Sequence, residues 1–292
     1  MGASAGTLRL GARRFVFPSW RHLLTMLGIG GAAITFVSLT ISGGNPVDAL
    51  SYWGIDPSEP YKVAAVQFAY TPVAVQVLVP FLELPFPVFV AIIRFVDLVA
   101  LVLLAGPATL PALLLPPVAA EINAANINLP MGLAVVAAFR WPGLWAFPLL
   151  TKVTPGVGVI WFAVRQEWRP FAIAVGTTAA IVAVSFLAAP DLWFRYVDFL
   201  LNDIDHVAGW PFPYPLWIRL PIAIVLVIWG ARTDHRWVVP AAALLALPRT
   251  YFQSPALLLA LLPTFYGGWA SIERWAPRWR RGLRGRSEPP AP

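Results

Sequence analysis

The sequence has no cysteine and few charged residues. Without cysteine, the chain can form neither a disulfide framework nor a thiolate nucleophile. Only 12% of its 292 residues are charged, whereas 59% are hydrophobic, and an average soluble domain carries about twice this charged fraction. A soluble protein of this length needs a polar surface, and these charged residues are too few to make one. The composition therefore predicts an all-α polytopic membrane protein.

The positive net charge of +7 is concentrated at the two ends of the chain. Basic clusters beside a membrane segment resist translocation and lie well against anionic lipid, so they usually mark the cytoplasmic side. We therefore expect a cytoplasmic basic lead at 1–21, a basic and partly disordered cytoplasmic tail at 271–292, and no nucleic-acid binding. The terminal arginines are Arg9, Arg13, Arg14 and Arg21 before the first apolar segment and Arg274, Arg278, Arg280, Arg281, Arg284 and Arg286 after the last.

The region 22–270 is predicted to be one transmembrane domain of about ten helices, some of them short or broken. A first span at 22–42 is long enough to cross the hydrocarbon core of about 30 Å, and 43–64 is expected to be an exterior loop. Several later apolar segments are too short to cross alone, and 30 prolines punctuate them; such pieces are tolerated where protein or water encloses them. Arg94 and Asp97 are expected to pair along a helix, and 191–213 to include a helix on the membrane surface. The later apolar segments are 66–82, 87–105, 109–120, 129–139, 142–151, 154–164, 170–189, 216–230, 237–248 and 254–269.

Asp48 is the candidate catalytic residue. Its carboxylate follows the first span on the expected exterior side, where it can act as general base on an acceptor hydroxyl. The alternatives are a solvated loop aspartate or a helix N-cap, and Asp56 competes with it for the catalytic role.

Small polar groups inside apolar sequence give the candidate binding residues. Polar side chains are costly in hydrocarbon and usually face a cavity, a partner or a substrate. Asn126 and Asn128 can bind sugar hydroxyls or phosphate oxygens, or else Asn128 caps the helix that follows. Tyr61 and Tyr70 can stack on or hydrogen-bond a sugar, or can be interfacial anchors.

Three cationic or titratable residues complete the candidate site. Lys152, one of only two lysines, can hold a phosphate as a point charge or reach toward the interface. Arg249 precedes the last apolar segment and can pair with phosphate or with Asp48. His206, which follows Asp203 and Asp205 in a polar stretch, can bind a divalent ion with these acids, orient a substrate or simply be solvated. The sequence shows no metal-ligand spacing, so we expect no dedicated metal site.

The order of these motifs resembles glycosyltransferase family 87, polyprenyl-phosphate-mannose-dependent mannosyltransferases with the membrane-embedded C-type fold. The resemblance extends from about residue 22 to about residue 270. It departs from the family pattern where Ala125-Asn126 replaces Gly-Gln and Tyr70-Thr-Pro replaces Tyr-Pro-Pro. The matching pieces are Asp48 to Tyr61, Phe68 to Pro72, Ala125 to Asn128, Lys152 to Pro155 with Arg165 to Arg169, and Pro248 to Ser254.

The resemblance implies transfer of a sugar, mannose above all, from a polyprenyl-phosphate carrier to a lipid or glycan hydroxyl on the exterior face of a bacterial plasma membrane. Asp48 is then the family's first-loop acid, and a divalent cation (Mg²⁺ or Mn²⁺) between Asp48 and the donor phosphate is left open. Two alternatives predict no chemistry: a transporter or flippase of lipid-linked saccharides, and a silent scaffold subunit.

Overall fold

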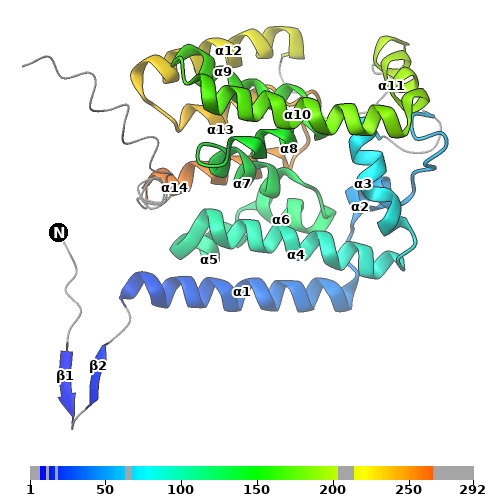
Figure 1. The fold of residues 1–292 in the computed structure, drawn as a ribbon. Coiled ribbons are helices and arrows are strands. Elements are labelled where there is room, and N and C mark those ends of the chain that lie inside the picture. Colours follow the sequence, from blue (N-terminus) through cyan, green and yellow to red (C-terminus); the bar gives the residue numbers. More distant parts are fainter. Residues whose placement is uncertain (1–6, 11–12, 17–18, 63–67, 203–213, 266–292) are drawn as a thin grey trace, which may run out of the picture.

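The computed structural model describes residues 7–10, 13–16, 19–62, 68–202 and 214–265, and apart from one hairpin its regular structure is helical (Figure 1). The hairpin consists of β1 (Thr7–Leu10) and β2 (Arg13–Val16), which pair antiparallel within the expected basic lead. The predicted all-α fold is thus confirmed for the membrane domain.

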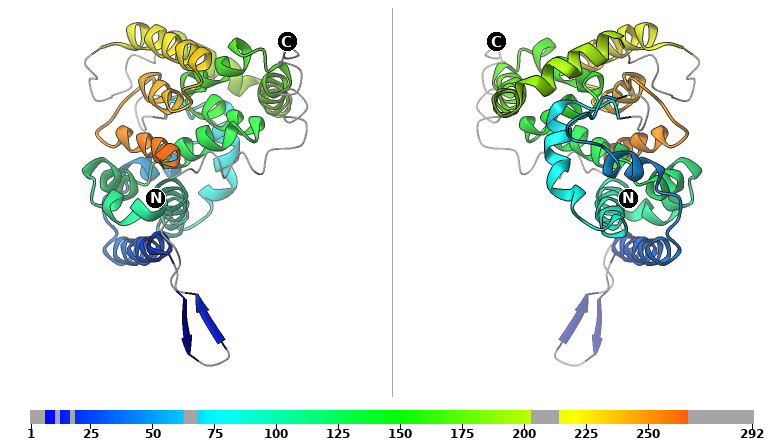
Figure 2. Two further views of the ribbon diagram at one scale, coloured as in Figure 1. Left: turned by 90° about the vertical axis from the view of Figure 1, so that its left-hand side faces the viewer. Right: turned by 90° about the vertical axis from the view of Figure 1, so that its right-hand side faces the viewer.

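Four helical stretches are long and apolar enough to cross a membrane among the described residues. They are α1 (Trp20–Ser42), α4 (Phe86–Ala105) continuing through η1 (Gly106–Ala108) and α5 (Thr109–Leu113), α10 (Trp168–Ala188) and α12 (Leu216–Thr233). The shortest, α12, has 18 residues and spans about 27 Å at about 1.5 Å per residue. In α1 and α10, only 11% of the most apolar window is buried within the protein. Figure 2 shows both helices end-on at the outside of the bundle, which suits contact with lipid.

Short helices fill the space between these stretches, and they form three pairs in which the two members follow each other in the sequence. An 11-residue helix such as α7 extends about 16 Å, roughly half of the hydrocarbon core, so it does not cross alone. The pairs pack against one another: α7 contacts α8 and η5, and α13 contacts η3. They are α6 (Pro116–Ala124) with α7 (Asn128–Ala138); η2 (Pro142–Trp145) and α8 (Ala146–Thr151) with η3 (Thr154–Val159) and α9 (Ile160–Val164); and α13 (Val238–Leu245) with η5 (Ser254–Leu261) and α14 (Leu262–Phe265).

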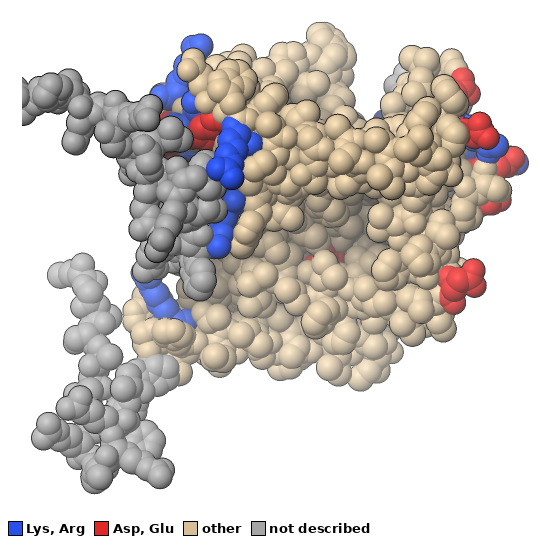
Figure 3. All heavy atoms as spheres, in the orientation of Figure 1, with Lys and Arg blue, Asp and Glu red and all other residues tan. Residues whose placement is uncertain are grey.

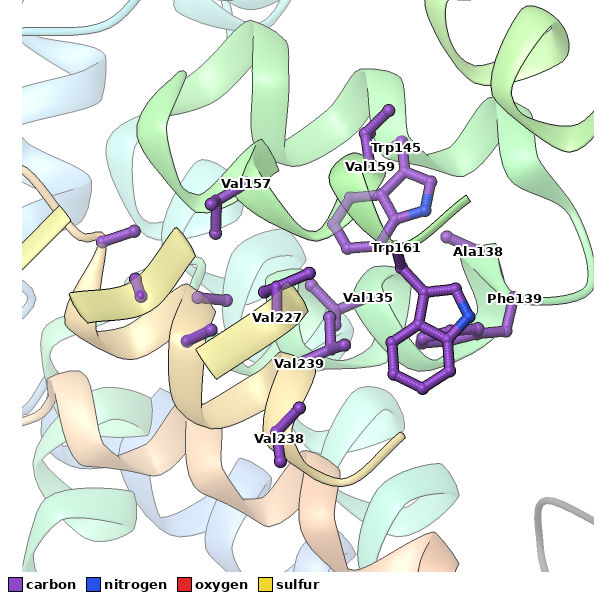
Figure 4. Packing of buried hydrophobic residues seen from close by; sticks show 14 of the residues in the cluster. Val135, Ala138, Phe139, Trp145, Val157, Val159, Trp161, Val227, Val238 and Val239 are labelled. Carbon is purple, nitrogen blue, oxygen red and sulfur yellow. The ribbon is translucent and has the colours of Figure 1, made fainter. Parts of the chain in front are cut away.

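The largest core cluster lies where these short helices meet α12. Trp145, Trp161 and Phe162 are almost fully buried there, and valines from α7, η3, α12 and α13 pack around them (Figure 4). In a bilayer, lipid tails are as apolar as a protein core, so such packing stabilises mainly through close van der Waals contact. A second cluster joins α4 to α6, α7 and η5, and a third joins α2 (Val47–Trp53), α3 (Pro72–Leu82) and α11 (Pro190–Asn202).

Charged side chains gather at two opposite edges of the molecule. In Figure 3, the described lysines and arginines are mostly at the left edge and the described acids mostly at the right edge, with a largely uncharged face between them. The basic edge includes the turn between α9 and α10, where Arg165 pairs with Glu167 and Asp234. This separation is typical of a protein whose charged edges lie in the two headgroup regions of a bilayer.

The helices follow the predicted apolar segments, with three differences. Only four stretches are long enough to cross among the described residues, so the count of about ten complete spans is not confirmed. The segment 43–64, expected to be a loop, includes the helix α2. Within the described part of the chain, the expected pair of Arg94 with Asp97 does not form, because the guanidinium of Arg94 binds backbone carbonyls instead.

Candidate active site

The predicted polar residues converge at the connections between the short helices. The α6–α7 connection carries Asn126, α7 begins at Asn128, and the α8–η3 connection carries Lys152. The α13–η5 connection lies against α2, because Gln253 hydrogen-bonds Asp48. Segments far apart in the sequence therefore build one site around the first turn of α2.

Asp48 is half-buried and is surrounded by hydrogen-bond donors. Gln253 Nε2 donates to Asp48 Oδ2 over 2.8 Å. Burial raises the pKa of Asp48, while hydrogen bonds from Gln253 and Asn126 and the charge of Lys152 act in the opposite direction. A carboxylate with a raised pKa that still has donors for its charged form suits a general base near neutral pH.

A chain of hydroxyl groups fixes the orientation of Asn126. The Tyr52 hydroxyl donates to Asn126 Oδ1 over 2.9 Å, and the backbone N–H of Ile127 donates to the same oxygen over 2.7 Å. The Tyr70 hydroxyl lies 2.9 Å from that of Tyr52, and since the Tyr52 proton is already used, Tyr70 is the donor of this pair. The amide nitrogen of Asn126 is then the group left to donate to Asp48.

Lys152 is held by a second polar chain that ends in a buried carboxylate. Its Nζ donates to Asn128 Oδ1 over 3.1 Å and lies 5.9 Å from the ring centroid of Tyr70. Asn128 in turn donates from Nδ2 to Glu121 Oε2 over 2.9 Å and from its backbone N–H to Oε1 over 2.5 Å. Burial lowers the pKa of Lys152, and Glu121 and Asp48 counteract this effect. Glu121 thus supports a positive charge next to Asp48.

Two non-glycine residues next to the polar side chains of the site have a positive φ: Ala125 precedes Asn126, and Val153 follows Lys152. Ala125 has φ 54° and ψ 59° and ends α6 directly before Asn126. Val153 has φ 54° and ψ −68°, and the Thr154 N–H donates to Lys152 O over 2.7 Å, which defines a γ-turn of the rare positive-φ kind. Such backbone conformations cost about 1–3 kcal/mol each and concentrate at functional sites.

Tyr61 and Asp56 have structural contacts outside this centre. The Tyr61 hydroxyl donates to Tyr70 O over 3.1 Å, and its ring stacks on Phe199. Tyr61 therefore supports the Tyr70 backbone. Asp56 is exposed, and its Oδ1 accepts two hydrogen bonds from Ser58: one from the Ser58 backbone N–H over 2.9 Å and one from the Ser58 hydroxyl over 2.7 Å. This is the pattern of an aspartate that stabilises a turn.

Arg249 lies within electrostatic reach of the centre. The pKa of Tyr251, two residues later, is raised, first by burial and then by the charge of Asp48, and the positive charge of Arg249 partly opposes this increase. The remaining predicted residue, His206, lies outside the described residues. The described part of the chain contains no group of three or more histidines or acids placed to hold a metal ion.

Three site residues were not among the sequence-based candidates: Glu121, Gln253 and Tyr52. Glu121 is the single acid at the end of an otherwise apolar segment, which is a signal of a functional carboxylate. Tyr52 follows Asp48 by one helical turn, a spacing that places both on one side of α2. Gln253 has no comparable signal, because its role depends on a contact across 205 residues.

The model of glycosyltransferase family 87 matches residues 68–266, more than half of the chain. The matched region contains Tyr70, Asn126, Asn128 and Lys152 and begins after Asp48. No curated protein and no solved structure shows significant similarity to the chain. The match and the membrane-helical fold lead to the same conclusion as the motifs: the chain belongs to glycosyltransferase family 87, a family of membrane glycosyltransferases.

Proposed function

We propose that the chain transfers a sugar, with mannose as the expected one, from a polyprenyl-phosphate carrier to a hydroxyl of a lipid or glycan acceptor. The observation that carries this proposal is the convergence of the Asp48 carboxylate and the Lys152 ammonium in one polar centre of an otherwise apolar domain. A base and a cation close together are what displacement of a phosphate from a sugar requires.

Asp48 is the base in this proposal. Its carboxylate takes the proton of the acceptor hydroxyl as the acceptor oxygen forms a bond to the anomeric carbon. The bond from that carbon to the phosphate oxygen breaks, and the electron pair leaves with the polyprenyl phosphate. Displacement from the opposite face inverts the anomeric configuration, so a β-linked donor gives an α-linked product.

Lys152 stabilises the leaving phosphate. Negative charge grows on the phosphate in the transition state, and a fixed ammonium in a poorly solvated site stabilises it strongly. The link from Lys152 through Asn128 to Glu121 keeps the ammonium in place. A divalent cation, with Asp48 as one of its ligands, would be the alternative source of this charge.

The prenyl chain has an apolar surface available to it. Figure 3 shows a hollow in the uncharged face, between α10 above and α4 below, with acidic atoms at its floor. Exposed apolar side chains of α4 such as Val88, Ile92 and Val96 suit a lipid tail that enters from the bilayer. A donor bound in this way presents its phosphate to the polar centre and its prenyl chain to lipid.

The charged edges support an orientation with the site reached from the exterior. The edge with the α9–α10 turn is basic and is therefore assigned to the cytoplasm. α1 leads from that side to α2, so Asp48 lies toward the opposite, exterior side, and both termini are assigned to the cytoplasm of a bacterial plasma membrane.

The test compares wild type, Asp48→Asn and Asp56→Asn in membranes supplied with radiolabelled polyprenyl-phosphate-mannose. We expect transfer by wild type and Asp56→Asn and its loss in Asp48→Asn at equal protein level. Equal transfer by all three would exclude Asp48 as the base. Absence of transfer in every sample, across several donors and acceptors, would favour the transporter or scaffold alternative.

A further inference from the structure

Arg94 is a buried arginine in the middle of the candidate span formed by α4. Its side chain is 1% exposed, and a charged group in this environment is costly unless other groups compensate it. The nearest acid along α4, Asp97, accepts no hydrogen bond among the described residues and forms no ion pair with Arg94. The compensation for Arg94 therefore comes from elsewhere.

The guanidinium of Arg94 binds the carbonyl ends of two helices. At the end of α1, it donates to Leu39 O over 2.9 Å and to Gly43 O over 3.0 Å. At the end of α6, it donates to Ile122 O over 3.3 Å and to Asn123 O over 3.0 Å. Carbonyls at helix C-termini lack helical partners and carry partial negative charge, so two such ends provide the counter-charge. The planar guanidinium, with donors in fixed directions, joins both ends at once.

The turn after α1 is fixed by the same group of atoms. The Asn45 N–H donates to Asn123 Oδ1 over 3.0 Å. Gly44 has φ +59°, and a Cβ at this position would lie 2.4 Å from Asn123 Oδ1 and 2.7 Å from Arg94 Nη2. The turn therefore accepts only glycine without a shift. It leads to Asp48 three residues after Asn45, and Asn126 follows Asn123 by the same number of residues.

We propose that Arg94 is a positioning residue that sets the distance between Asp48 and Asn126, and thereby the catalytic geometry of the site. It acts on both through the backbone and contacts no substrate. The inference rests on the proposed function of Asp48. Misplacement of a reacting group by about 1 Å can cost about 100-fold in rate, so loss of this double contact acts on kcat rather than on donor binding.

The test measures kcat, KM and the pH profile of transfer for Arg94→Lys and for Gly44→Ala. Lysine keeps the charge but cannot reach four carbonyls, and alanine adds the Cβ that the turn excludes. We expect both variants to lower kcat about 10- to 100-fold with KM for the donor within about twofold. We also expect the acidic limb of the profile to move to higher pH, because Asp48 loses the hydrogen bond from Asn126.

The matched control is Arg165→Lys. Arg165 also donates to a helix-end carbonyl, from Nη1 to Ala231 O over 3.0 Å, but at the basic edge away from α2. This variant is expected to keep wild-type kcat and pH profile. Wild-type kcat in Arg94→Lys would overturn the proposal, as would a loss that only follows the amount of folded protein with an unchanged pH profile.

A distance measurement tests the same proposal without activity. The chain has no cysteine. Cysteines introduced at exposed Val47 on α2 and exposed Ala119 on α6 are therefore the only positions that a thiol-reactive spin label modifies. In the Arg94→Lys background, electron–electron double resonance is expected to give a broader or shifted distance distribution. An unchanged distribution would refute the positioning role, whereas absence of transfer by wild type with a changed distribution would refute only the proposed function.

Discussion

Replacement of Gln253 by leucine tests the base role of Asp48 most directly. Gln253 is 9% exposed, and its amide donates to Asp48 over 2.8 Å. Leucine has a similar size and removes this donor. A hydrogen bond to a charged group contributes about 1.5–3 kcal/mol, and about 1.4 kcal/mol corresponds to one pKa unit. Since the donor favours the charged form, its loss raises the pKa of Asp48 by about one to two units.

The rate depends on the deprotonated base, so the acidic limb of kcat/KM against pH should move upward by the same amount. Above the new pKa, most of the transfer rate should return, which separates this effect from misfolding. The control is Gln76→Leu on α3. The Gln76 amide also donates within the fold, to Ser185 O over 3.0 Å, and among the described residues it makes no hydrogen bond to Asp48. An acidic limb at the wild-type position in Gln253→Leu would refute the assignment of Asp48 as the titrating base.

Three further predictions concern Glu121 and the residues linked to it, the packing of α1, and the metal requirement. Glu121→Gln places an amide against the two N–H groups of Asn128 and removes one charge-assisted hydrogen bond, so we expect kcat to fall about tenfold or more. We expect the fall in kcat to be smaller in Asn128→Ala than in Lys152→Ala. Gly28→Val is expected to reduce the amount of folded protein on detergent extraction, because a Cβ at Gly28 would lie 2.6 Å from Thr109 Cβ; a normal yield would show that α1 can shift at no cost. EDTA is expected to leave the transfer rate unchanged because Lys152 supplies the cation, and a rate restored only by Mg²⁺ would establish the ion-bridged alternative.

The sequence predicted the helical segments well because polarity in a membrane protein is sparse. Each interruption of apolar sequence, such as those at Asn126 and Lys152, is costly in hydrocarbon and therefore marks a helix end or a site. The predicted segments 129–139 and 170–189 correspond closely to α7 and α10. Hydropathy does not tell whether a short segment crosses the membrane or turns back inside it, which is why the number of spans was not recovered.

Part of the polar cluster around Asp48 was selected from the sequence for the same reason, and its role as a catalytic or binding site stays a prediction. Asn128 and Lys152 were selected as separate polar groups, and the structure joins them directly. The roles of Glu121 and Gln253 depend on contacts between helices, and no local pattern encodes those contacts. Tyr61 was selected as a tyrosine that stacks on or hydrogen-bonds a sugar or anchors the interface, and in the structure its hydroxyl donates to Tyr70 O.

The arrangement of α1 links the position of Asp48, the proposed base, to the thickness of the bilayer. α1 is 23 residues long, about 34 Å, and lies largely exposed at the edge of the bundle, while its last turn leads through Gly43 and Gly44 to Asp48. A helix longer than the hydrocarbon core tilts to keep its apolar side chains in lipid, and this tilt moves the end to which Asp48 is attached. Transfer rates measured after reconstitution into lipids of increasing acyl-chain length should therefore pass through a maximum, with hydrophobic mismatch acting on catalysis through one helix.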